Sequence, residues 1–167
     1  MRQQQPKVRR AVAADCEAIA GFNQAMAMET EGHALDPATI NAGVAAALTD
    51  PDKGFYLVAE MDGQPAACLM ITYEWSDWRN AWFWWIQSVY VVPEFRRQGL
   101  YRTLYQAARD LAREQGDVCG FRLYADNDNH RAHDTYQALG MDRCRYQMFE
   151  DLVDPQDGSS EVGASKA

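Results

Sequence analysis

The sequence predicts an α+β fold built around one sheet, and three observations support this prediction. Apolar residues recur at helical spacing in two stretches between residues 15 and 48. Three strand-like runs then follow one another over 55–92, which predicts an antiparallel meander. Beyond Gly99 the pattern changes to a helix, a strand, a helix and a final strand. A chain of 167 residues in this order is expected to form a single domain.

The first two helices carry recognisable start signals. Asp15 can cap a helix that we expect over about 15–29, where apolar residues lie on one helical face. A polar segment ends this helix. Asp36 followed by Pro37 then predicts a second helix to about Leu48, because Asp is a good N-cap and Pro is favoured at the first helical position.

Six strands are predicted from apolar runs bounded by turn residues. The dipeptide Asp62-Gly63 predicts a tight hairpin within the meander. Pro93 ends the last strand of the meander, because proline cannot donate to a sheet ladder. The predicted strands are 7–12, 55–60, 66–75, 81–92, 119–125 and 143–151.

Two further helices follow the meander. The first is expected from the region of Gly99 to about Gln115, and the second from about His130 to Leu139, closed by Gly140. The tail is rich in Gly, Ser and acidic residues, which predicts flexibility. The predicted organisation is therefore a flexible arm, one domain and a flexible tail, at 1–6, 7–153 and 154–167.

Composition and charge exclude several classes of protein. Apolar residues make up 47% of the chain and charged residues 24%, as in globular domains. The 16 basic and 24 acidic residues give a net charge of −8. Nucleic-acid-binding proteins usually present a basic face, and an anionic membrane repels an acidic chain. We therefore expect neither nucleic acid nor membrane as a partner.

The cysteines and the N-terminus predict a cytoplasmic protein. Cys16, Cys68, Cys119 and Cys144 are far apart and include no C-x-x-C pair, so we expect free thiols in a reducing compartment. The first residues contain no apolar region of the kind found in secretory signals. The longest strictly apolar runs have six residues, whereas a spanning helix needs about 20.

The strongest functional signal lies at 89–102, where a strand leads through a basic, glycine-containing turn into a helix. A helix N-terminus offers about four unpaired N–H donors and a partial positive charge. Arg96, Arg97 and Arg102 add full charges, and Gly99 lets the backbone approach a ligand closely. The combination predicts a phosphate site. A plain surface turn with arginines at a helix start is the alternative; neither a Walker A loop nor a Rossmann turn is present.

A second signal lies on the helix that follows Asn129. Asn129 can cap this helix, and Tyr136 lies seven residues later, about two turns along the same face. Ala132 between them leaves room for a narrow ligand. A tyrosine with an ordinary pKa of about 10 arrives protonated and can donate a proton. The alternative is a core tyrosine near a helix end.

Together, the two segments resemble the motifs of the GCN5-related N-acetyltransferases (GNAT). Val-x-Val-x-Pro followed by Arg-x-x-Gly-x is similar to the acyl-CoA-binding motif of that superfamily. Asn-x-x-Ala-x-x-x-Tyr-x-x-x-Gly-Met is similar to its next motif, and the element order over 7–152 is similar as well. The resemblance implies a mixed, mostly antiparallel sheet of six or seven strands flanked by helices, and acetyl-CoA as the acetyl donor.

The resemblance also implies roles for individual residues. The main chain of 89–91 should pair with the pantetheine arm, and the Val91 N–H should polarise the thioester carbonyl. Backbone N–H groups of 97–102 should hold the pyrophosphate, Asn129 should bind the cofactor, and Tyr136 should protonate the departing thiolate. The expected cofactor-binding residues are Val89, Tyr90, Val91, Arg96, Arg97, Gln98, Gly99, Leu100, Tyr101, Arg102 and Asn129.

The sequence departs from the family pattern at two positions. Tyr101 stands where the acyl-CoA motif usually has Gly or Ala, so its ring must turn away from the phosphates. Tyr124 stands five residues before Asn129, where members that acetylate protein N-termini often carry Glu. The second departure weakens the case for an N-terminal protein acetyltransferase and leaves the general base unassigned.

A general base is needed because an ammonium group, with a pKa near 10.4, cannot attack a thioester. Glu74, at the end of a meander strand, is the first choice. Asp126, Glu29 and Glu31 are further candidates, and a water molecule can relay the proton. Each of these carboxylates can instead be a solvated surface group.

All five tryptophans lie between Trp75 and Trp85. Consecutive aromatic residues on a strand point to both faces of a sheet, which predicts a core strand together with a subunit interface. The alternative is an aromatic wall for a cationic acceptor, with a cation–π contact to its amine. The expected acceptor-binding residues are Glu29, Tyr73, Trp75 and Asp77.

We therefore predict an N-acetyltransferase that moves an acetyl group from acetyl-CoA to a primary amine by direct attack in a ternary complex. The acceptor is a small-molecule amine or a protein lysine, and a homodimer is left open. No metal is expected, because His130 and His133 lack an acidic or cysteine partner at ligand spacing. The alternative is a non-catalytic acetyl-CoA-binding sensor or structural module.

Overall fold

A computed structural model describes residues 6–153 as two compact units. The first unit extends to Asn127 and contains the sheet with three helices, and the second begins at Asp128 and contains one helix. The predicted tail at 154–167 and most of the predicted arm lie outside the described residues. Among the described residues, no helix has both the length and the hydrophobicity that crossing a bilayer requires.

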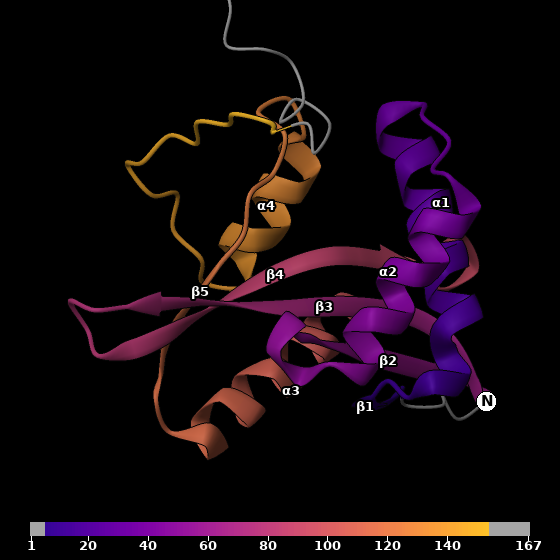
Figure 1. Ribbon diagram of the computed structural model, residues 1–167, viewed down its shortest axis with the longest axis horizontal. Coiled ribbons are helices and arrows are strands. Elements are labelled where there is room, and N and C mark those ends of the chain that lie inside the picture. Colours follow the sequence, from indigo (N-terminus) through magenta and orange to yellow (C-terminus); the bar gives the residue numbers. More distant parts are fainter. Residues whose placement is uncertain (1–5, 154–167) are drawn as a thin grey trace, which may run out of the picture. The chain divides into compact units, whose positions relative to one another are not determined.

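The sheet of the first unit has five strands in the order β1-β2-β3-β4-β5 (Figure 1). Neighbouring strands are antiparallel except β4 and β5, which run parallel. The strands are β1 (Lys7–Arg10), β2 (Phe55–Met61), β3 (Gln64–Ser76), β4 (Ala81–Val91) and β5 (Val118–Arg122). The mixed, mostly antiparallel α+β sheet is therefore confirmed, with five strands instead of six or seven.

The strand predicted at 143–151 is wrong. The described residues of this segment form no strand, and Tyr146, Met148 and Phe149 are exposed there. An alternating pattern determines which way side chains point, but a strand also needs a neighbouring backbone to satisfy its N–H and C=O groups. The alternation in this segment therefore does not by itself produce a strand.

Helices cover both faces of this sheet: α1 (Cys16–Glu31) and α2 (Pro37–Thr49) lie on one side, and α3 (Leu100–Gln115) lies on the other (Figure 1). Short 3-10 turns occupy 13–15, 51–53 and 93–95. As predicted, the Asp36 carboxylate caps α2, accepting from the Thr39 N–H at 2.8 Å. The Asp62-Gly63 hairpin is also confirmed, and both residues have the positive φ that such a turn requires.

Asp15 precedes α1 as predicted, but its side chain does not cap the helix. Its carboxylate accepts two hydrogen bonds from the Arg9 guanidinium, at 2.7 and 2.9 Å, and one from the Val12 N–H. Arg9 also donates to Glu60 on β2. The Arg9 guanidinium holds the pKa of Asp15 below its usual range. This network fixes the start of α1 against the edge of the sheet.

The core is divided by the sheet into two layers. The layer under α1 and α2 contains Tyr56, Val58, Cys68 and Tyr90 from the strands. The layer under α3 is formed by the alternate strand residues and by apolar residues of the helix. This second layer includes Leu57, Leu69, Ile71, Trp84, Leu104 and Ala108, all at most 1% exposed. Successive strand residues therefore serve different layers, as the strand period of two requires.

Trp84 is the largest side chain in this second layer. It contacts Phe55 and Phe121 edge to face, with ring centroids 5.3 and 6.0 Å apart. Within residues 6–153 its indole nitrogen has no hydrogen-bond partner, although it is buried. Trp84 therefore stabilises the fold through its packing area.

Trp84→Ala is expected to lower the free energy of unfolding by about 3–5 kcal/mol, because it leaves a large cavity. Trp84→Phe keeps a ring and loses no hydrogen bond, so we expect about 1–2 kcal/mol. Urea denaturation followed by circular dichroism measures both values. Equal losses for the two variants would show that the indole N–H, not the ring, stabilises the protein.

Candidate active site

The edge of β4 that faces β5 is paired for only part of its length. β5 pairs with Trp82 to Trp85, whereas β4 continues to Val91. Within the described chain, no strand pairs with this edge beyond Trp85. On its other side, β4 remains bound to β3, and the Val92 N–H donates to the Ala66 carbonyl at 2.9 Å. Because main-chain direction alternates, Val91 turns its N–H and C=O away from β3, toward the unpaired edge.

A β-bulge lies in this unpaired part of β4. Cys68 pairs with Tyr90 and Met70 pairs with Gln87, so Leu69 alone faces two β4 residues, Ser88 and Val89. Ser88 has a φ of 48°, in the left-handed region. A bulge bends a strand and redirects its main-chain groups. The bulge immediately precedes the stretch 89–91 that we expect to bind pantetheine.

The segment after β4 has the geometry of an anion site. Gly99 is the N-cap of α3, with a φ of 81° and no side-chain cap. The first N–H groups of α3 therefore point out of the helix without intrahelical acceptors. A Cβ built on Gly99 would meet no atom within 4 Å, so the space before the helix is open. The neighbouring Arg97 and Arg102 are exposed.

Tyr101 does not obstruct this helix start. Its ring stacks on Tyr105, one turn further along α3, with centroids 6.3 Å apart and planes 23° apart. Tyr105 is buried, and the hydroxyl oxygen of Tyr101 is buried as well, so the Tyr101 ring lies against the buried side of α3. A ring packed in this way is compatible with the expectation that Tyr101 turns away from the phosphates, which stays a prediction.

The Arg96 side chain donates three hydrogen bonds to two partners. Its Nε donates to the Val91 carbonyl at 2.9 Å, and its Nη2 donates to both oxygens of Glu29, at 3.0 and 2.7 Å. The Tyr90 hydroxyl donates to Glu29 at 3.0 Å. The hydrogen bond from Arg96 holds the pKa of Glu29 below its usual range. Glu29, which the sequence predicted to bind the acceptor, is thus bound to Arg96, at the start of the loop 96–99 that was predicted to bind phosphate (the phosphate loop).

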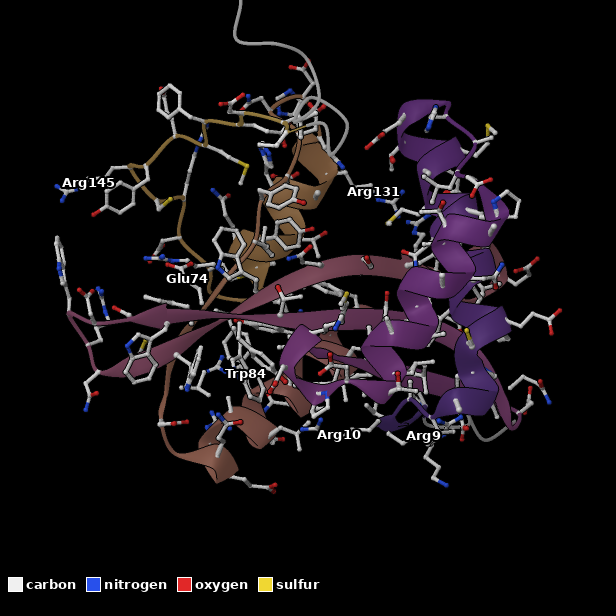
Figure 2. The ribbon with its side chains drawn as sticks, viewed as in Figure 1. Arg9, Arg10, Glu74, Trp84, Arg131 and Arg145 are labelled. Atoms are coloured by element: carbon white, nitrogen blue, oxygen red, sulfur yellow. The ribbon has the colours of Figure 1, made fainter. Side chains whose placement is uncertain are left out.

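Glu74 lies on the sheet face opposite to Trp84 (Figure 2). One carboxylate oxygen accepts from Arg122 at 2.6 Å, and the other accepts from the Trp85 indole nitrogen at 2.5 Å. The Arg122 guanidinium also stacks on Phe83, 3.7 Å from the ring centre. Glu74 and Arg122 remain 38% and 34% exposed. Strands β3, β4 and β5 therefore build a partly exposed polar cluster on this face.

The structure does not bring the predicted acceptor-binding residues together. Tyr73 and Trp75 point to the α3 side of the sheet, where Tyr73 contacts Phe55 and Trp84. Asp77 lies in the exposed turn between β3 and β4 and accepts from the Trp78 N–H. Sequence reasoning missed Arg122, whose only signal was its place in a predicted strand.

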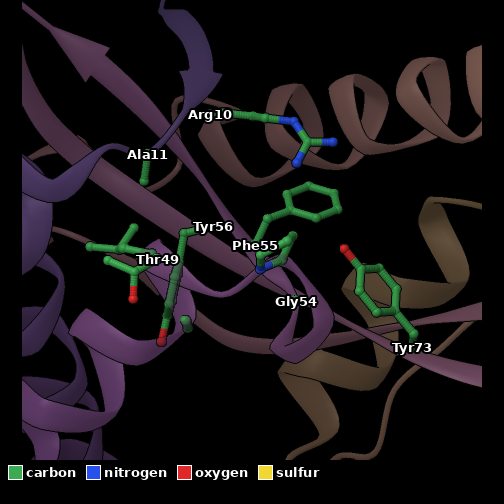
Figure 3. Close-up of a pocket in the computed structure, with 10 residues that line it drawn as sticks. Arg10, Ala11, Thr49, Gly54, Phe55, Tyr56 and Tyr73 are labelled. Atoms are coloured by element: carbon green, nitrogen blue, oxygen red, sulfur yellow. The ribbon is translucent and has the colours of Figure 1, made fainter.

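A separate pocket of about 200 Å³ lies at one end of the sheet of the first unit (Figure 3). Arg10 stacks on Phe55 there, 3.9 Å from the ring centre, and Tyr73 lines the same pocket. Burial raises the pKa of Tyr73. The pocket contains none of the residues predicted to bind the cofactor.

The second unit contains α4 (His130–Ala138). Asn129 caps it as predicted, because its Oδ1 accepts from the Ala132 N–H at 3.1 Å. The side-chain NH₂ group of Asn129 is therefore the part that it can offer to a ligand. Tyr136 is half-buried, and burial raises its pKa. A raised pKa keeps the phenol protonated, as a proton donor must be.

Comparison with known proteins identifies the family. Residues 18–141 match the family model described as the acetyltransferase (GNAT) family. A possible acetyltransferase from Clostridium difficile 630 is 41% identical; the match covers 90% of this chain and 99% of that chain, with a TM-score of 0.84. The chain therefore belongs to the GNAT acetyltransferase family, as its motifs predicted.

Two further proteins are similar to the chain, one over a short segment and one in its fold. The thialysine N-epsilon-acetyltransferase of Caenorhabditis elegans is 34% identical over 61 residues, which is 36% of this chain and 38% of the worm protein. The match thus spans little more than a third of that curated relative. An aminoglycoside N-acetyltransferase in complex with CoA is 16% identical and has a TM-score of 0.73, with 91% of this chain and 99% of that chain covered. At this identity the likeness concerns the fold alone.

Proposed function

We propose that this acetyltransferase uses acetyl-CoA as donor and acetylates a primary amine by direct attack in a ternary complex. One observation carries the proposal: the unpaired edge of β4 leads directly into a glycine-capped helix start flanked by exposed arginines. An extended pantetheine arm can pair with such an edge, and a pyrophosphate suits such a helix start. The name of a relative that is 34% identical over 61 residues, thialysine N-epsilon-acetyltransferase, supports an amine as acceptor for this chain.

The donor side follows from the main chain. Val91 turns its N–H to the unpaired edge, where it can stabilise negative charge that develops on the thioester oxygen during attack. The open N–H groups at the start of α3 would hold the pyrophosphate, with the charges of Arg97 and Arg102 beside them. Asn129 would add a side-chain hydrogen bond to the donor. Tyr136 would give its proton to the departing sulfur.

The acceptor side of the proposal rests on the partly exposed polar cluster of β3, β4 and β5. Both faces of the sheet are closed where helices pack on them, under α3 at Leu69 and Leu104 and under α1 and α2 at Val58. On the face opposite to α3, Glu74, Trp85 and Arg122 form a polar cluster that is partly exposed, so we place the acceptor over this cluster. Glu74, directly or through a water molecule, would receive the proton that the attacking amine loses. The amine thus loses one proton and sulfur gains one.

The alternative is a non-catalytic acetyl-CoA-binding module. It is favoured by one observation, the engagement of both Glu74 oxygens by Arg122 and Trp85. Turnover of acetyl-CoA with any amine decides against it. The four free cysteines are consistent with the cytoplasmic location that we propose. The homodimer stays a prediction.

Titration calorimetry with acetyl-CoA, and with CoA for comparison, tests the donor site. We expect micromolar binding, about −8 kcal/mol. Gly99→Glu should abolish it, because a carboxylate would lie beside the pyrophosphate. Gly99→Gln is the control: it has the same size and the same backbone cost at positive φ without the charge. Equal affinity of the two variants for acetyl-CoA would remove the phosphate site from the proposal. A wild-type protein that does not bind acetyl-CoA at millimolar concentration would have the same consequence.

Tyr136→Phe should lower kcat by about 10²–10⁴, the range of general acid catalysis, and leave acetyl-CoA affinity unchanged. Because burial raises the pKa of Tyr136, the wild-type phenol should stay protonated past pH 10, so it should not limit activity at neutral pH. Initial rates of CoA release between pH 6 and 10 measure both effects. An unchanged kcat would exclude Tyr136 as the proton donor.

Glu74→Gln should reduce kcat/KM for the amine by about 10²-fold near neutral pH and less at alkaline pH, where more amine is already deprotonated. Glu114→Gln, the same substitution at an exposed residue of α3, is the control and should keep full activity. A uniform loss at every pH would indicate that Glu74 binds or positions the acceptor and is not its base.

A further inference from the structure

The interactions of Arg96 join three separate parts of the first unit. Its side chain bonds the last residue of β4, Val91, and the carboxylate of Glu29 on α1, while Arg96 itself begins the phosphate loop. Tyr90 completes the group, since its hydroxyl bonds Glu29 and its ring stacks on Phe22 with centroids 5.4 Å apart. We name the group of Glu29, Tyr90, Val91 and Arg96 the Arg96 tie.

The tie uses most of the binding capacity of Arg96. A guanidinium has five N–H donors. Nε donates to Val91, and Nη2 serves both Glu29 oxygens. The Glu29 carboxylate, 2.7 Å away, also neutralises the positive charge. In the part of the chain that the structure describes, neither Arg97 nor Arg102 forms an ion pair, so these two keep their charge for a ligand.

The residue after Arg96 needs support. Arg97 has a φ of 64°, a left-handed conformation that costs a residue with a side chain about 1–2 kcal/mol. Such a conformation persists only where the surrounding structure holds it. Arg96 is the adjacent residue, and its side chain is fixed at both β4 and α1. The tie therefore fixes the start of the loop in the strained form that leads to Gly99.

We propose that Arg96 is a positioning residue of the donor site and not a phosphate ligand. The tie holds the end of β4 and the phosphate loop in one arrangement, so that the Val91 N–H and the first N–H groups of α3 can bind one acetyl-CoA molecule together. Glu29 accordingly belongs to the donor site and not to the acceptor site. The inference rests on the proposed function, because it requires that this loop binds the donor.

Glu29→Gln separates the two roles of Arg96 by the sign of its effect. If Arg96 positions the loop, loss of the ion pair loosens the site, and the Kd for acetyl-CoA rises, by about three- to fivefold for a partly exposed pair. If Arg96 binds phosphate, removal of the nearby carboxylate frees its charge and the Kd falls. Calorimetry at fixed ionic strength measures the change. An unchanged or lower Kd overturns the inference.

Two variants control this measurement. Asp110→Asn removes a similar ion pair, Asp110 with Arg113 at 2.7 Å, from the exposed side of α3 and should leave the Kd unchanged. The double variant Glu29→Gln/Arg96→Gln replaces an ion pair, whose net charge is zero, by two uncharged side chains. It should weaken binding without altering the dependence of Kd on salt, whereas Arg97→Gln should reduce that dependence. A smaller salt dependence in the double variant would make Arg96 a phosphate ligand.

Failure of this inference differs from failure of the proposed function. If the wild-type protein does not bind acetyl-CoA, the donor site itself is wrong. If it binds and Glu29→Gln binds equally or more tightly, only the role of the Arg96 tie is wrong. Melting temperatures of all variants complete the test: a Kd change that appears only in a variant already unfolding at the assay temperature counts against positioning.

Discussion

The site depends on one constraint, the short pairing between β4 and β5. Two parallel strands that stayed paired would use every main-chain group along their common edge. Here the pairing stops at Trp85, and the part of β4 that leads to the phosphate loop keeps a row of N–H and C=O groups without a strand partner in the described chain. Unpaired sheet edges invite another extended chain to bind. A pantetheine arm is such a chain, so in the proposed function the short pairing is what leaves an edge of β4 open for the donor.

Much of the fold could be predicted because its signals are local. Caps and apolar spacing located α2 and α4, and Asp62-Gly63 located the hairpin. The strand at 143–151 could not be judged in this way, because alternation is local whereas a partner for the backbone is not. The geometry after β4 was predictable because it is local: the strand end, the arginines, the glycine and the helix start follow one another in the sequence. That this segment binds phosphate stays a prediction.

The residues around Glu74 were less predictable, because contacts across a sheet depend on the strand period and on the register between strands. Tyr73 and Glu74 are adjacent, so the strand period alone places them on opposite faces, and they cannot line one site. The partner of Glu74 is Arg122, 48 residues away, and their contact follows from the parallel register of β4 with β5. Hydrophobic pattern predicts that two strands exist, but it does not determine which residues lie opposite each other.

Local charge, not net charge, decides what this acidic chain can bind. The net charge of −8 opposes an anionic ligand at long range, but beyond about 8–10 Å such exposed charges are screened in physiological salt. Near the helix start, Arg97 and Arg102 are exposed, whereas the charge of Arg96 is balanced by Glu29. The sequence alone does not distinguish these three arginines. In the structure, Arg96 has a carboxylate partner, whereas Arg97 and Arg102 form no ion pair among the described residues. An arginine whose charge is neutralised by a carboxylate can fix the loop, and an arginine without such a partner can attract an anion. The proposed donor site needs both, because it must bind a pyrophosphate and also place a thioester carbonyl beside the Val91 N–H.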